Sequence, residues 1–153
     1  MLLQLGIGAL VVSLTIVVEA AFIGGAIRML VRYGPWLGTP PYTRKSILAL
    51  IGVTLWLLAA LTVCVWIWAA AFVSVGVFDA LEPAIYFSVV AFTTLGFGDI
   101  TLPETWRLLS GISAANGLLL FGLSTAVLVE VLRGLRQAQD RRETGSERTG
   151  ART

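Results

Sequence analysis

Three long apolar stretches limit the folds open to this chain. They run from about Leu2 to Met29, from about Ser46 to Val75 and from about Leu108 to Leu132. A helix needs roughly 20 mostly apolar residues to cross the hydrocarbon core of a bilayer, so each stretch is long enough. The chain is 57% hydrophobic and only 13% charged, whereas about a quarter of a soluble domain is charged. The sequence therefore predicts an all-α membrane protein with three transmembrane helices.

Basic residues gather around the connection between the first two stretches and again after the third. The first group is Arg28, Arg32, Arg44 and Lys45, and the second is Arg133, Arg136, Arg141, Arg142, Arg148 and Arg152. Cytoplasmic loops of membrane proteins carry an excess of Lys and Arg. We therefore expect a multi-pass protein of the cell membrane, with its N-terminus outside and its C-terminus in the cytoplasm.

Composition also divides the chain into segments. We expect a transmembrane helix at 1–33, a cytoplasmic Pro/Gly-rich turn at 34–45, a membrane unit at 46–133 and a basic cytoplasmic tail at 134–153. The tail is polar and is expected to be disordered. The chain has no histidine and one cysteine, which excludes a histidine-based metal site and an internal disulfide. No catalytic constellation is present, so we expect no enzyme, no organic cofactor and no nucleic-acid partner.

A shorter apolar run, Pro83 to Leu95, lies between the second and third stretches and is too short to cross a membrane. Asp79 and Glu82 have the spacing of a capping box, and a proline suits the first turn of a helix. We therefore expect a short helix at 81–93 that enters the membrane from the outside.

The segment that follows reads "AFTTLGFGDITLP" and loses helical character at its glycines. Non-helical backbone at membrane depth is tolerated only where it is buried in protein or lines a wet cavity, which favours a pore. Alternating glycines allow successive carbonyls to turn toward one axis, where they can replace the water shell of a cation. One strand cannot enclose an ion, so we expect a closed symmetric oligomer.

These residues carry a resemblance to a known family. The string "TTLGFGDI" resembles the selectivity filter of potassium channels, whose usual form is Thr-Val-Gly-Tyr/Phe-Gly-Asp. The string "EPAIYFSVVAFTT" resembles the pore helix of that family, and "WRLLSGISAANGLLLFGLSTAVLVEVL" resembles its inner helix. The resemblance implies a pore domain at 46–133, with an outer helix at 46–75, a pore helix at 81–93, a filter at 94–99 and an inner helix at 106–133.

By this resemblance the protein is a passive, potassium-selective channel made of four identical chains in a lipid bilayer. Potassium ions would be held by the Thr94 hydroxyl and by the main-chain carbonyls of Thr94, Leu95, Gly96 and Phe97, with Gly98 completing the filter. Leu95 departs from the usual valine, Phe97 from tyrosine, and Phe87 stands where many relatives have tryptophan. The ring-to-ring hydrogen bond of those relatives cannot form, so apolar packing is expected to support the filter.

Two further expectations follow for the residues around the filter. Tyr86 is expected to donate a hydrogen bond to Asp99 and to act as the main polar tie of the filter. On the inner helix, the resemblance places four side chains at the cavity and gate: Leu118, Phe121, Thr125 and Val129. The same spacing also fits ordinary packing between helices. Gly117 and Gly122 are expected either to act as hinges or to permit close packing.

Several residues within the apolar stretches carry open alternatives. Glu19 is expected either to bond to a polar group on the second stretch or to sense protons. Asn116 is expected either to bond to the pore helix or to face the cavity. The tryptophans are expected mostly to anchor the helices in lipid: Trp56, Trp66, Trp68 and Trp106.

Three other functions compete with a potassium channel. A non-selective cation channel is one, because Leu95 and Phe97 alter the support of the filter. A non-conducting accessory membrane subunit is another. A potassium transporter subunit is the third, although such proteins carry four pore loops in one chain and this chain has one.

Overall fold

The computed structural model describes residues 1–37 and 42–150. It contains four helices, α1 (Leu2–Leu37), α2 (Tyr42–Ser74), α3 (Leu81–Phe92) and α4 (Arg107–Gly150), and none of the described residues forms a strand. Three of these helices, α1, α2 and α4, are long and apolar enough to cross a membrane. The predicted all-α membrane fold with three spanning helices is therefore confirmed.

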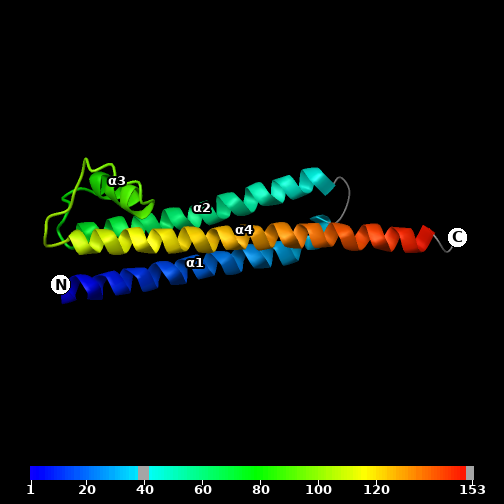
Figure 1. Ribbon diagram of the computed structural model, residues 1–153, viewed down its shortest axis with the longest axis horizontal. Helices are drawn as coiled ribbons and strands as arrows, with labels where there is room; N and C mark the ends of the chain where they lie inside the picture. The colour runs from blue at the N-terminus through cyan, green and yellow to red at the C-terminus, as the bar shows by residue number, and fades with distance from the viewer. Residues whose placement is uncertain (38–41, 151–153) are drawn as a thin grey trace.

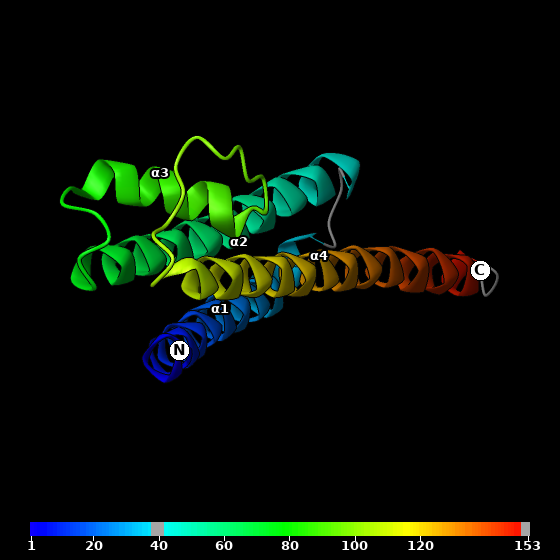
Figure 2. The same ribbon diagram turned by 60° about the vertical axis from the view of Figure 1, so that its left-hand side comes forward.

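The three long helices form a bundle, and α3 lies at one end of it (Figure 1). The helices α1 and α4 run in the same direction, and α2 runs antiparallel to both. The views in Figures 1 and 2 place α1 and α3 on opposite sides of the α2–α4 pair, and α1 contacts α2 and α4 but not α3. The N-terminus and α3 share one end of the bundle, whereas the end of α1 and the C-terminal end of α4 lie at the other.

The helix α3 begins without the predicted capping box. Its N-cap is Ala80, in an extended conformation and with no side-chain hydrogen bond to the helix. The helix starts at Leu81, so Asp79 lies one residue too early to cap it, and Glu82 occupies the second helical position. Pro83 is in the first turn, where the missing N–H would have had no helical partner.

The buried core lies where α2, α3 and α4 meet, and α1 contributes to it. Phe72 of α2 makes an edge-to-face contact with Phe87 of α3, with ring centroids 5.2 Å apart. Trp68 is fully buried in the same cluster, with Leu109 of α4 and Val11 of α1. The expectation that Trp68 faces lipid is therefore wrong, because its ring fills the space beneath the short helix.

Two helix ends differ from the sequence-based boundaries. The backbone of α1 remains helical to Leu37, past the expected start of the turn at 34, and Pro35 lies in its last turn. The backbone of α4 continues to Gly150, beyond the expected end at 133 and through most of the tail that was expected to be disordered. Arg, Gln, Ala and Glu after residue 133 are strong helix formers. Residues 38–41 and 151–153 lie outside the described residues.

Candidate functional site

The loop after α3 has an alternating backbone conformation. Thr93 ends the helix with φ −81° and ψ −1°, and positive φ then recurs at Thr94 (60°), Gly96 (56°) and Gly98 (80°). Among the described residues, Thr94 is the one non-glycine residue with a positive φ. Left-handed residues at every second position turn successive carbonyls toward the same side, and such strain in a non-glycine residue tends to mark functional sites.

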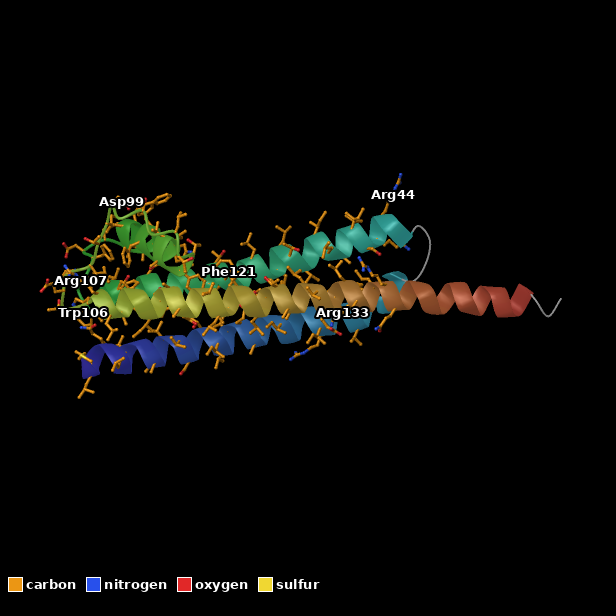
Figure 3. The ribbon with its side chains drawn as sticks, in the orientation of Figure 1. Arg44, Asp99, Trp106, Arg107, Phe121 and Arg133 are labelled. Atoms are coloured by element: carbon orange, nitrogen blue, oxygen red, sulfur yellow. The ribbon has the colours of Figure 1, made fainter. Side chains whose placement is uncertain are left out.

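Both ends of this loop are tied to α3. The N–H of Thr94 donates to the carbonyl of Ala91 at 2.9 Å, and the N–H of Leu95 donates to that of Val90 at 3.0 Å. At the other end, the Tyr86 hydroxyl donates a 2.6 Å hydrogen bond to Oδ2 of Asp99. Asp99 lies at the tip of the loop in Figure 3. The expected contact between Tyr86 and Asp99 is therefore present.

This contact changes the acidity of both groups. The Tyr86 hydroxyl favours the charged form of Asp99 and so holds the pKa of that carboxyl below its ordinary value, with smaller help from the Ile100 N–H. The same hydrogen bond raises the pKa of Tyr86 above its ordinary value, because the phenol donates its proton to a carboxylate. Around neutral pH the pair is therefore a phenol bonded to a carboxylate.

The two large apolar side chains of the loop are not packed within the chain. Leu95 is 57% exposed and Phe97 is 64% exposed. Phe87, which was expected to support the filter, instead packs on Phe72 and Phe78. Behind the loop lies a cavity of about 320 Å³, whose lining includes Phe87, Gly96 and Ile100. Phe87 therefore packs on aromatic rings from α2 and from the segment before α3.

The backbone of α4 touches the end of α3 at Gly117. A methyl group added to Gly117 would lie 2.7 Å from the carbonyl carbon of Phe92, a contact that no side chain tolerates. A methyl group on Gly122 would meet nothing within 4 Å. Of the two alternatives for Gly117, the structure therefore gives a direct reason for close packing.

The four residues expected at the cavity and gate share an exposed face of α4: Leu118, Phe121, Thr125 and Val129. Phe121 also contacts the ring of Phe92, with centroids 5.9 Å apart, and it is labelled midway along the bundle in Figure 3. The Thr125 hydroxyl donates to the carbonyl of Phe121 at 2.8 Å. The chain leaves this face open, so ordinary packing against its own helices does not account for the pattern.

The opposite face of α4 is bonded to α1. Nδ2 of Asn116 donates to Oγ1 of Thr15 at 2.7 Å, and Oγ of Ser124 donates to Oε1 of Glu19 at 2.6 Å. The partners expected on α3 for Asn116 and on the second span for Glu19 are therefore wrong. The reason is that α1, rather than α2 or α3, covers this face of α4. Sequence reasoning missed Ser124, although a buried serine on a spanning helix is a signal for such a bond.

An ion pair lies between the loop and the start of α4. Glu104 forms an ion pair with Arg107 at 3.3 Å, and both side chains are exposed. The start of α1 reaches the same region, where the Gln4 side-chain amide donates to the carbonyl of Thr105. The acidic charge of Glu104 is thus partly offset by its neighbour.

Comparison with known proteins gives one match. Residues 60–134 match a family model described as "Ion channel". The matched segment runs from the middle of α2 through α3 and the loop to α4, and it contains all the filter and inner-helix candidates. No curated protein and no solved structure matches the chain.

Proposed function

Since residues 60–134 belong to a family of ion-channel pores, we propose that the chain forms a passive, potassium-selective channel of four identical subunits. The observation that carries this proposal is the alternation of left-handed residues at Thr94, Gly96 and Gly98. A non-helical strand of this kind at the end of a short helix suits a row of carbonyls facing a central axis.

The proposed filter comprises residues 94–99. Potassium would be coordinated by the hydroxyl of Thr94 and by the carbonyls of Thr94, Leu95, Gly96 and Phe97. These oxygens would replace the hydration shell of the ion, so transport requires no bond-making step and no organic cofactor. Asp99 and Tyr86 act outside the row of carbonyls, where they fix the end of the strand.

The exposed side chains of the loop support an assembly. Leu95 and Phe97 are large and apolar, yet the chain does not cover them. A ring of four subunits would supply neighbouring surfaces on both sides of each strand and would close the row of carbonyls around an ion. The open face of α4 would then line the cavity below the filter.

The proposed orientation has the N-terminus outside and the C-terminus in the cytoplasm. Arg44 near the start of α2 and Arg133 on α4 both lie toward the end of the bundle away from α3 (Figure 3). Positive charge is concentrated on the cytoplasmic side of membrane proteins. The loop and its acidic residues would therefore face the exterior.

A non-selective cation channel is a second candidate, and one observation favours it. Phe97 is 64% exposed within the chain, and a filter held by fewer contacts can adapt to ions of different size. Full-length protein reconstituted in liposomes separates the candidates. A selective channel passes potassium and excludes sodium, a non-selective channel passes both, and an accessory subunit passes neither and forms no tetramer.

A further inference from the structure

We propose that Glu19 is a positioning residue for the gate: its hydrogen bond with Ser124 holds the cytoplasmic half of α4 against α1 and keeps the pore shut. This inference rests on the proposed function, because it assigns α4 to the pore lining. The helix α1 lies outside the matched segment 60–134. The inference gives this helix a direct role in opening.

The outer half of α4 is fixed by two contacts. Asn116 bonds to Thr15 at 2.7 Å, and one residue later the backbone of Gly117 lies against the carbonyl of Phe92. Since one contact is to α1 and the other to α3, this part of α4 cannot tilt without disturbing the pore helix. Any bend in α4 must therefore occur beyond Gly117.

Gly122 is the first glycine of α4 beyond Gly117, and a bend there would place Ser124 on the moving side. A glycine weakens a helix locally, and a methyl group at Gly122 would meet nothing within 4 Å. In the structure α4 nevertheless passes this point without a visible kink (Figure 1). Ser124 lies two residues beyond Gly122, so its bond to Glu19 holds α4 on the far side of the weak point.

The hydrogen bond is the specific part of this contact. Beyond it along α4, Val127 and Val131 belong to an apolar cluster that also includes Leu30 of α1 and residues of α2. Such contacts resist sliding weakly in a membrane, because lipid tails are as apolar as the side chains they would replace. A serine–carboxyl bond instead requires one position of α4 relative to α1.

Breaking this bond is unfavourable for Glu19. Its side chain is fully buried, and within the described residues its second oxygen, Oε2, has no hydrogen-bond partner. Without Ser124 the carboxyl group would have no donor in an apolar medium, which is costly. The helix α1 is also held by α2, since Nε1 of Trp56 on α2 donates to the carbonyl of Phe22 on α1 at 2.8 Å.

Single-channel recording of the full-length protein in planar bilayers tests the inference. Ser124→Ala removes the donor and should raise the ratio of open to closed time about tenfold, with conductance and ion preference unchanged. Ser124→Thr retains a hydroxyl and should restore a ratio within about twofold of the original. Ser13→Ala is the matched control, because the Ser13 hydroxyl bonds to the Ala9 carbonyl of its own helix. An unchanged or lowered ratio in Ser124→Ala would overturn the inference.

A distance measurement separates this inference from the proposed function, because it needs no current. Spin labels at Val129→Cys, in a Cys64→Ala background, report the spacing of the α4 helices in the reconstituted protein. Ser124→Ala should add a population at longer distance, and Ser124→Thr should not. If the channels conduct potassium while this distance distribution stays unchanged, the role of the Glu19–Ser124 bond is refuted and the proposed function stands. If the distribution shifts in a protein that passes no ions, the proposed function is refuted and the role of the bond in holding α4 against α1 stands.

Discussion

The hydroxyl of Tyr86 donates a hydrogen bond of 2.6 Å to Oδ2 of Asp99. It connects the first half of α3 to the residue that follows the second glycine of the loop. The start of the loop is held by main-chain bonds to Val90 and Ala91, so the strand between these ties is fixed at both ends. Phe87 and Phe97 carry no polar side-chain group, so this side-chain hydrogen bond connects the later end of the strand to α3.

Removing this bond should affect the stability of the conducting state rather than ion preference. Tyr86→Phe keeps the ring and deletes the donor, so the strand should leave its conducting conformation more readily. We expect openings several-fold shorter, or faster inactivation, with an unchanged potassium-to-sodium permeability ratio, because the coordinating carbonyls remain. Tyr33→Phe is the control, since Tyr33 lies at the opposite end of the bundle. Unaltered open times in Tyr86→Phe would count against the role of the bond.

The same pair predicts a dependence on external pH. The pKa of Asp99 is lowered by the bond, so its contribution is present at neutral pH and is lost as the pH falls through that lowered value. The pKa of Tyr86 is raised, so the phenol keeps its proton until the pH rises above its ordinary range. Openings should therefore be stable through neutral pH and shorten in acid. Tyr86→Phe should lose most of this acid sensitivity, and equal sensitivity in both proteins would contradict the assignment.

Gly96 tests the row of carbonyls directly. Its φ of 56° is one that L side chains rarely adopt, so Gly96→Ala should rotate a carbonyl away from the axis. We expect potassium flux into liposomes to fall below detection while the assembly persists. Gly6→Ala in α1 is the control, because a methyl group there meets nothing within 4 Å. Normal potassium-selective current through Gly96→Ala would remove residues 94–99 as the filter.

Gly117 and Gly122 should differ when each is replaced by alanine. At Gly117 the new methyl group would press on the backbone of Phe92, which cannot move as a flexible side chain can. Gly117→Ala should cost about 1–3 kcal/mol of stability and should lower the unfolding temperature in detergent. Gly122→Ala should leave that temperature unchanged or raise it slightly. Equal unfolding temperatures for both variants would show that α4 does not touch α3 in this way.

Charge at the outer end should set the local concentration of cations. Glu104→Gln should lower single-channel conductance, and the loss should be larger in dilute than in concentrated potassium, because salt screens exposed charge. Arg107→Gln removes the partner of the ion pair and should change conductance in the opposite direction. A loss that is the same at all potassium concentrations would exclude a surface-charge effect.

Much of the architecture can be predicted because it depends on local properties of the sequence. The length of the apolar stretches predicts the three spans, and the short helix appears at Leu81–Phe92 against an expected 81–93. The contact between Tyr86 and Asp99 is also predictable, because the chain reverses between them and brings both to the same end of the bundle. The capping box fails for a local reason too, since a start one residue later leaves Asp79 outside the helix.

The contacts of α1 could not be predicted in the same way. Glu19 and Asn116 are recognisable as buried polar residues that need partners, but their partners depend on which helix lies beside which. Apolar helices pack against one another with little distinction in lipid, so the sequence pattern does not favour α4 over α2 as the neighbour of Glu19.

The reversal potential of single channels tests the central claim most directly. Full-length protein is placed in a planar bilayer with potassium on one side and an equal concentration of sodium on the other. The proposed filter predicts a reversal potential far from zero, with the sign of a membrane that passes potassium and excludes sodium. A reversal potential near zero would show that the pore does not select potassium, and the absence of current from assembled protein would show that the loop does not conduct.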